Sequence, residues 1–262
     1  MDAARHTTLI VDVKTAARTL DLFEAFEALG GPASLTELAE RIGMPVSSCF
    51  ALVRTMQRRG YVYSLRGRGP LYPTGRLLTV ARALAEHDVL SQRLSNDLAA
   101  LRDCCGETVV IETLNGREAL YIDVFESHQQ IRYSPRAGAR RPAHANSIAK
   151  AVMGAFLPAE RNRILQGLEY RKLTSRTILS ASRLEADLLK GMRRGWFTNL
   201  GESAEDLAAV DVPIAINGDW FGISIAGPLQ RIKPRMSSLA KSLREIVRAN
   251  KGALAGQRRS GG

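Results

Sequence analysis

The sequence predicts an α/β (α+β) protein in which two domains are joined by a helix. The chain has 262 residues, and at about 100–200 residues per domain this length favours two domains. Residues 10-76 have the pattern of three helices followed by a short hairpin. Residues 102-252 mix paired strands with flanking helices, so we do not expect a doubly wound sheet there. The intervening residues 77-101 have a helical pattern with a possible break near His87-Asp88, and we expect them to link the domains.

Capping and apolar spacing predict the first two helices. Ser34 with Glu37 three residues later forms a capping box, in which each residue satisfies a backbone donor of the other. This pair marks the start of the second helix, and Gly30-Gly31-Pro32 separates it from the first. In the first helix, from Lys14 to Leu29, residues at helical spacing predict one buried face: Ala16, Leu20, Phe23, Phe26 and Leu29.

A third helix and a hairpin complete the N-terminal domain. The helix runs from about Pro45 to Arg59, where Gly60 ends it. Tyr61 to Leu65 has the composition of a strand, and Leu71-Tyr72 returns after a turn rich in glycine and arginine. The order helix, helix, turn, helix and hairpin is that of a winged helix-turn-helix domain.

The charge distribution suggests what this domain binds. The net charge is +11, and between Arg41 and Ala85 there are eight arginines but no acidic residue. A one-signed surface attracts polyanions, nucleic acid first. The alternative is a solvated surface that only keeps the protein soluble, but such surfaces usually mix both signs.

The start of the third helix is narrow enough to enter the major groove of DNA. Its serines can donate to phosphates or bases, and arginines along the helix and at the hairpin tip can contact phosphates. The candidate DNA-binding residues are Pro45, Val46, Ser47, Ser48, Phe50, Arg54, Arg58, Arg66 and Arg68. Two alternatives remain open, because Ser47 can serve only as a helix cap and some winged helices dock proteins.

The sequence pattern of the C-terminal domain predicts paired strands with helices between them. Asn115-Gly116 lies between Val109–Ile111 and Ala119–Asp123 and is a strong hairpin signal. A second capping box, Ser182 with Glu185, opens a helix that ends near Gly195. Further strands are expected at 131–134, 196–199, 207–216 and 220–226, and further helices at 145–157, 159–168 and 235–249.

The sequence offers little support for an enzyme. The segment around Ser224 resembles a nucleophile elbow, but it lacks the second glycine and no helix follows it. His144 stands without a partnered motif, so a hydrolase using Ser224 is the least favoured alternative.

The three cysteines lack the spacing of metal ligands, and no cofactor motif is present, so we expect neither a metal nor a cofactor. With no membrane-length apolar run and no signal peptide, we expect a cytoplasmic protein without a membrane partner.

An ordered series of motifs resembles the IclR family of bacterial regulators over nearly the whole chain. The N-terminal half contributes the segments 19–23, 35–45 and 59–62. The C-terminal half contributes Gly106-Glu107-Thr108-Val109, Arg136-Ala137-Gly138, Pro142-Ala143-His144-Ala145, Lys150-Ala151, Leu173-Thr174-Ser175-Arg176-Thr177-Ile178, Arg194-Gly195-Trp196 and Ser224-Ile225-Ala226-Gly227-Pro228.

The resemblance implies a GAF-like effector-binding domain and a homodimer or homotetramer. It also implies a metabolite effector, commonly a small organic or aromatic acid. The pocket positions fall on His144, Asn146, Ser147, Ile148, Asn199, Ala209, Ser224 and Ala226. This sequence departs from the family where Asp211 interrupts an otherwise apolar strand.

An acid effector needs a cation or several N–H donors in a mostly apolar cavity. We predict that Arg136 or a neighbouring arginine (Arg132, Arg140 or Arg141) holds its carboxylate, or that the helix N-terminus near His144 does. The alternative is that this basic loop is exposed to solvent. Together these features predict a sequence-specific DNA-binding transcriptional regulator that a small molecule controls. A ligand sensor whose winged helix docks a protein remains the alternative.

Overall fold

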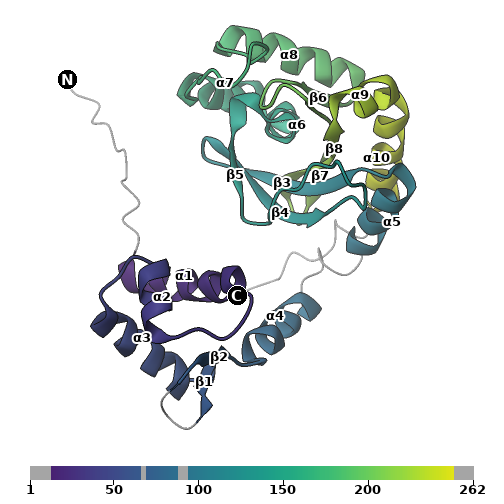
Figure 1. The fold of residues 1–262 in the computed structure, drawn as a ribbon. Helices are drawn as coiled ribbons and strands as arrows, with labels where there is room; N and C mark the ends of the chain where they lie inside the picture. Colours follow the sequence, from purple (N-terminus) through teal and green to yellow (C-terminus); the bar gives the residue numbers. More distant parts are fainter. Residues whose placement is uncertain (1–12, 66–68, 88–93, 251–262) are drawn as a thin grey trace, which may run out of the picture. The chain divides into compact units, whose positions relative to one another are not determined.

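The computed structural model describes residues 13–65, 69–87 and 94–250 and divides the chain into two compact units (Figure 1). The first unit is Met1–His87 and the second is Asp88–Gly262. Each unit has its own apolar core, so each is described by itself.

Three helices pack together in the N-terminal unit: α1 (Lys14–Leu29), α2 (Leu35–Arg41) and α3 (Val46–Arg58). The predicted capping box at Ser34 is present, and Gly30 ends α1 in the left-handed conformation. The predicted buried face of α1 needs correction, because Leu20 is 64% exposed and Leu29 is 39% exposed. The buried residues are instead Leu22, Ala25 and Phe26, whose i, i+3, i+4 spacing also makes one face.

The hairpin has the expected antiparallel strands, β1 (Val62–Ser64) and β2 (Leu71–Pro73). Tyr63 and Tyr72 pair across it with their ring centroids 5.1 Å apart. Leu71 forms a bridge to Ala33, which ties the wing to the segment before α2. The predicted DNA-binding residues Arg66 and Arg68 lie outside the described residues.

Two helices occupy the segment that the sequence assigns to a linker. Helix α4 (Arg76–His87) belongs to the first unit, and α5 (Ser95–Cys105) to the second. Leu98 and Leu101 of α5 pack into the core of the C-terminal unit. The expected boundary at residue 102 therefore differs from the structure, because the apolar face of α5 is buried against the sheet.

Six antiparallel strands form the sheet of the C-terminal unit in the order β5-β4-β3-β8-β7-β6. The central pair, β3 and β8, joins segments more than 100 residues apart, with Val110 opposite Ser224. Because side chains alternate across a sheet, each strand supplies two different layers. The strands are β3 (Thr108–Asn115), β4 (Glu118–Phe125), β5 (Arg140–Pro142), β6 (Phe197–Leu200), β7 (Leu207–Ile216) and β8 (Asp219–Pro228).

Helices cover both faces of this sheet (Figure 1). Helices α5 and α10 (Met236–Asn250) cover one face, where Val210, Ile223 and Ile225 lie in the larger core. Helix α6 (Ser147–Ala155) covers the opposite face, and its apolar residues pack against α8. The remaining helices are α7 (Pro158–Gly167), α8 (Ala181–Arg194) and α9 (Leu229–Ile232), with 3-10 turns η3 (Ala143–Ala145) and η4 (Lys233–Arg235).

Local details of this domain differ from the sequence expectations. Residues 131–134 are not a strand, and β5 pairs with β4 instead. Ser180, not Ser182, caps α8 by accepting a hydrogen bond from the Arg183 amide. The first hairpin turns at Gly116 and Arg117, because Asn115 still pairs with Glu118. Among the described residues, no helix combines the length and apolarity needed to cross a membrane.

Candidate functional site

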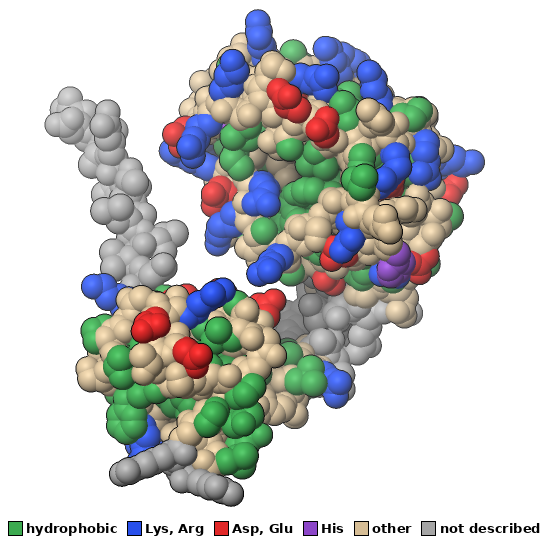
Figure 2. Space-filling view, viewed as in Figure 1, with side chains coloured by type: hydrophobic (Ala, Val, Ile, Leu, Met, Phe, Trp, Pro, Cys, Tyr) green, Lys and Arg blue, Asp and Glu red, His purple; other side chains and the backbone are tan. Residues whose placement is uncertain are grey.

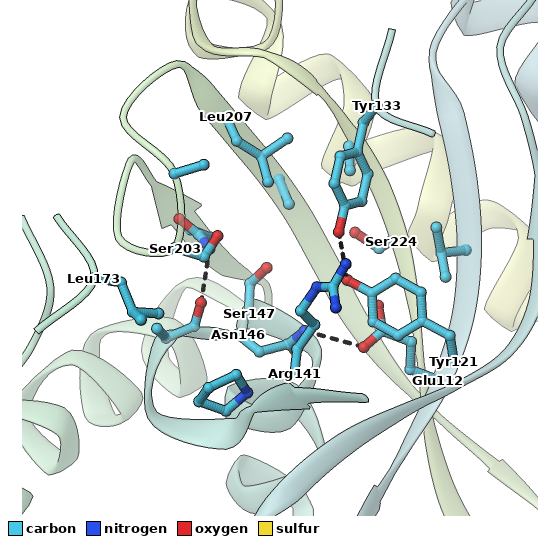
Figure 3. A pocket seen from close by; sticks show the side chains of 17 residues that line it. Glu112, Tyr121, Tyr133, Arg141, Asn146, Ser147, Leu173, Ser203, Leu207 and Ser224 are labelled. Carbon is cyan, nitrogen blue, oxygen red and sulfur yellow. Dashed lines mark hydrogen bonds between the residues drawn. The ribbon is translucent and has the colours of Figure 1, made fainter. Parts of the chain in front are cut away.

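A cavity of about 340 Å³ lies in the C-terminal unit between the sheet and the N-terminal end of α6 (Figure 3). Its volume falls at the small end of the range for small-molecule sites. Figure 2 shows apolar side chains near the middle of the visible face of this unit and basic ones around its margin. The lining residues are Val110, Glu112, Tyr121, Tyr133, Arg141, Pro142, Ala145, Asn146, Ser147, Leu173, Asn199, Ser203, Ala204, Leu207, Ala209, Ser224 and Ala226.

Glu112 places a carboxyl group in the wall of the cavity. Strand β3 pairs with β8 without a shift, and Glu112 therefore lies on the same face as Val110, two residues before it. Glu112 is 2% exposed and accepts a 3.0 Å hydrogen bond from Asn146 Nδ2 (Figure 3). Burial, followed by the charge of Asp211, raises the pKa of Glu112 well above its ordinary value.

Asp211 lies on the same face of the sheet, opposite Ser224 on β8. It is fully buried, and neither of its carboxyl oxygens has a hydrogen-bond partner. Burial raises the pKa of Asp211 to about 7, and the neighbouring hydroxyls of Ser147 and Ser224 and the charge of Lys150 lower it only in part. These hydroxyls lie beside the carboxyl group without meeting hydrogen-bond geometry, and both line the cavity.

Arg141 and two tyrosines form another part of the wall. The hydroxyl oxygens of Tyr121 and Tyr133 are 2.9 Å apart, and the Arg141 guanidinium lies 5.9 Å from the ring centroid of Tyr121. Arg141 is exposed, as are Leu173 and Ala204, so these three mark the mouth of the cavity. A cation at the mouth is suited to holding an anionic ligand group.

Asn146 and Asn199 are fixed by backbone contacts on either side of the cavity. The Asn146 side chain caps α6 by accepting from the Ala149 amide at 2.9 Å. The Asn199 side chain donates to the carbonyl of Ala145 at 2.8 Å and accepts from the Glu202 amide at 2.9 Å. These bonds hold the chain before α6 and the loop after β6 in place around the cavity.

A buried ion network lies behind this loop. Lys150 on α6 is fully buried, and its Nζ lies 2.7 Å from a carboxylate oxygen of both Asp187 and Glu202. It also donates to the carbonyl of Thr198 at 3.0 Å. All three of its donors therefore have partners, which identifies Lys150 as a structural residue of the site.

The cavity brings together most of the effector residues predicted from the sequence. Those that line it are Asn146, Ser147, Asn199, Ala209, Ser224 and Ala226. Arg136 does not line it, because its side chain is exposed in the loop before β5. Of the other arginines considered, Arg132 pairs with Glu126 and Arg140 with Glu118, which leaves Arg141 in the wall.

Two further predicted residues point elsewhere. His144 Nε2 is 2.8 Å from the carbonyl oxygen of Arg171, and its ring packs edge-on against Tyr170. Ile148 packs so closely on Gly222 that a Cβ there would collide with it. Both are buried structural residues, because the turn into α6 directs Asn146 and Ser147 toward the cavity instead.

Sequence reasoning missed several lining residues. Glu112 could have been predicted to line a site, because it is a charged residue inside an apolar strand. Tyr133 and Ser203 gave none, because they lie in loops with no repeating pattern.

The N-terminal unit presents an exposed face on α3. Cys49, Val53 and Met56 are buried in the core, so the opposite side of the helix faces solvent. Phe50 is 54% exposed, and the Arg54 guanidinium lies 6.0 Å from its ring centroid. The predicted DNA-binding residues on this exposed face are Pro45, Val46, Ser47, Ser48, Phe50, Arg54 and Arg58.

A helix-turn-helix unit and a separate unit with a ligand-sized cavity define a class of protein, the effector-controlled transcriptional regulators. The comparisons with known proteins agree. Residues 15–66 match the IclR helix-turn-helix domain, and residues 81–251 match the bacterial transcriptional regulator IclR C-terminal domain. The chain belongs to the IclR family and is a DNA-binding transcriptional regulator.

Individual relatives match over most of their length. The probable transcriptional regulator SauR of Cupriavidus necator is 30% identical over 86% of this chain and 89% of its own. The Thermotoga maritima IclR structure covers 94% of this chain and 100% of its own at 21% identity, with a TM-score of 0.77. An IclR homolog from Microbacterium hydrocarbonoxydans, solved in complex with 4-hydroxybenzoate, gives a TM-score of 0.66 at 20% identity over 90% of this chain and 99% of its own.

Proposed function

We propose that this regulator contacts its operator through the exposed face of α3 and binds its effector in the cavity beside α6. The observation that carries the proposal is the cavity, because residues from β3, β7, β8 and the start of α6 converge on it. The effector we propose is a small organic acid whose carboxylate lies toward Arg141. The Microbacterium relative that binds 4-hydroxybenzoate supports an acid of this size.

Operator binding by α3 rests on its charge and shape. Arg54 and Arg58 lie four residues apart on the exposed face, where both can reach phosphates. The exposed ring of Phe50 offers an apolar contact of the kind made with a thymine methyl group. No acidic residue between Arg41 and Ala85 opposes the approach of DNA.

Replacing Arg54 or Arg58 with alanine is expected to weaken operator binding about 5- to 30-fold, because each loses a phosphate contact. The slope of log affinity against log salt should become shallower by about one unit per arginine. Fluorescence anisotropy on the DNA upstream of the protein's own gene, over a salt series, measures both. Arg163→Ala is the matched control, because Arg163 is an exposed arginine on α7. Equal binding by all three variants would contradict the proposed interface.

The same titration separates DNA regulation from protein docking by the winged helix. Regulation requires binding that excess competitor DNA does not abolish. Binding to all sequences alike, or none at low salt, would favour the docking alternative.

Filling the cavity should uncouple the regulator from its effector. Ala209 lines the cavity and is 6% exposed, so Ala209→Trp places an indole in the ligand volume. We expect the thermal shift produced by 4-hydroxybenzoate or related acids to disappear, because a bound ligand stabilises the folded state by mass action. DNA binding without ligand should persist.

Ala137→Trp provides the control, because Ala137 is exposed in the loop before β5. That variant should respond to acids as the unchanged protein does. An undiminished response in Ala209→Trp would place the effector elsewhere.

The proposed assembly is a homodimer or homotetramer. Exposed apolar side chains on α1 and α4 are the candidates for its interface, because subunit interfaces commonly bury large apolar side chains. These side chains are Leu20 at 64%, Leu77 at 44%, Leu78 at 54% and Leu84 at 68% exposure. A dimer would place two α3 helices on paired half-sites of an operator.

Control by the effector is proposed to be a population shift. A ligand changes DNA affinity only by the ratio of its affinities for the two conformations. We propose no catalytic activity and a cytoplasmic site of action. Ser224 lies within a strand, and His144 bonds the Arg171 carbonyl, so this pair does not form a nucleophile and base.

A further inference from the structure

One acidic side chain, Glu112, lines the cavity, and a second, Asp211, is buried behind its wall. Ser224 in β8 has Val110 on one side and Asp211 on the other, and Glu112 follows two residues after Val110. Because residues two apart share a face, Glu112 and Asp211 both point to the α6 side of the sheet. Asp211 is thus opposite Ser224, and Glu112 is opposite Gly222, two residues before Ser224 on β8.

Lys150 and Arg141 compensate these carboxyl groups only in part: the charge of Lys150 lowers the pKa of Asp211 and that of Arg141 lowers the pKa of Glu112, but burial outweighs both. Lys150 already pairs with Asp187 and Glu202, two carboxylates for one ammonium group. Arg141, the cation of the cavity wall, is exposed at the mouth. Among the described residues around this region, Glu112, Asp211, Asp187 and Glu202 are acidic and Lys150, Arg141 and Arg194 are basic, with Arg194 acting on Asp187. Tyr121 and Tyr133 add hydroxyls. The inner end therefore has an excess of acidic groups.

Asp211 is the least satisfied of these groups. Both of its oxygens are buried without a hydrogen-bond partner. Buried polar groups in folded proteins nearly always have partners, so such a group calls for an explanation. Two small side chains, Ser147 and Ser224, lie beside Asp211 and also line the cavity, so their hydroxyls can rotate to relay a hydrogen bond to the ligand.

We propose that the effector is an amino-bearing carboxylic acid, with its ammonium group at Glu112 and Ser224, whose hydroxyl relays to Asp211, and its carboxylate toward Arg141. This inference rests on the proposed effector site. The proposed function places only the carboxylate of the ligand, and the inference adds an ammonium group at its other end. An ammonium group supplies the missing positive charge and up to three hydrogen-bond donors. A hydroxyl group supplies a donor but no charge, so a hydroxy acid would satisfy the site less well.

Proton release follows from the same arrangement. Without ligand, burial favours the protonated form of both carboxyl groups. An ammonium group favours their ionised form, so its binding should expel protons and tighten as the pH rises from about 6 to 8. An acid without the amine should not do this.

Two matched ligand pairs test the proposal by isothermal titration calorimetry on the full chain: 4-(aminomethyl)benzoate against 4-methylbenzoate, and 5-aminopentanoate against pentanoate. The amine-bearing member of at least one pair should bind about 10- to 100-fold tighter, the range expected of charge-assisted hydrogen bonds. Titrations in phosphate and in Tris, which differ in ionisation enthalpy, should show proton release for that member alone. 4-Hydroxybenzoate should bind with intermediate affinity.

Variants assign the effect to the two carboxyl groups. Asp211→Asn and Glu112→Gln should each lose most of the preference for the amine and release fewer protons, while binding of the acid without the amine stays or improves. Asp123→Asn, at an exposed position on β4, is the control and should keep the full preference.

The proposal is overturned if both pairs bind equally or favour the acid without the amine, or if proton release is absent. When acids without an amine still bind and change operator affinity, only the ammonium inference fails and the effector site stands. When no acid of either kind binds the unchanged protein, the inference and the effector site fail together. When only a hydroxy acid binds tightly, the donor at the inner end is a hydroxyl and the ammonium is excluded.

Discussion

Lys150→Met is expected to lower the unfolding free energy of the C-terminal domain by about 3–5 kcal/mol, the usual cost of removing one partner from a buried ion pair. The change leaves Asp187 and Glu202 without their shared cation. Burial already raises the pKa of Glu202 despite the opposing effect of Lys150, so Glu202 would have to take up a proton or be solvated. Both outcomes loosen the loop that Glu202 ties to Asn199.

Urea unfolding followed by tryptophan fluorescence measures this loss for the C-terminal domain alone, because Trp196 and Trp220 are the two tryptophans of the chain. Lys241→Met is the matched control. Lys241 is 74% exposed, and its Nζ lies 4.0 Å from Glu245, so its loss should cost less than about 0.5 kcal/mol. Adding Glu202→Gln to Lys150→Met should restore part of the stability. Equal stability of the two lysine variants would show that the buried network contributes nothing.

Asp211→Asn is expected to stabilise the protein, and increasingly so at higher pH. In the folded chain the pKa of Asp211 is raised from 3.8 to about 7, so the folded state binds the proton more tightly than the unfolded state. Stability must then fall as the pH rises between these values, with the full penalty present above about pH 7. At 1.36 kcal/mol per pKa unit the penalty is at most about 4 kcal/mol. Asparagine removes it.

Unfolding free energies of the two proteins between pH 5 and pH 8.5 test this expectation. The difference should grow by roughly 2–3 kcal/mol between pH 5 and pH 8, because about 1–2 kcal/mol of the penalty is already present at pH 5. Asp123→Asn should follow the unchanged protein at every pH, because Asp123 is exposed. A constant difference across the range would mean that Asp211 does not titrate as its burial requires.

Greater stability together with a lost ligand preference would mark Asp211 as a functional residue. Binding sites commonly retain groups that cost stability, because the ligand supplies what the fold leaves unsatisfied. A structural aspartate would show the opposite result, since replacing it would weaken the fold.

Local physics explains which parts of the fold could be predicted. Helix α1 has the predicted bounds, because Gly30 ends it in a conformation that favours glycine. Strand β7 also has its predicted bounds, because a run of apolar residues ends at Asn217-Gly218, where both residues have positive φ. The buried face of α1 was misjudged, because the spacing of apolar residues allows several overlapping faces and contact with α2 and α3 selects one.

The candidate site could be predicted only where family motifs mark it. The resemblance named Asn146, Ser147, Asn199, Ala209, Ser224 and Ala226, and these residues line one cavity in the structure. The resemblance could not show that Arg141, and not Arg136, lines the cavity. That choice depends on the path of the loop before β5 and of β5 itself. It also could not show that His144 bonds the Arg171 carbonyl and that Ile148 packs against Gly222, so that neither residue lines the cavity.

By itself, the sequence determined the family, the two-domain order and the basic face of α3, since these depend on residue types and on neighbours close along the chain. Only the tertiary structure decided that Glu112 and Asp211 face the same space beside Ser224. Their meeting depends on the register of β3, β8 and β7. A one-residue change of register would turn these side chains to the opposite face of the sheet, and no local pattern encodes that choice.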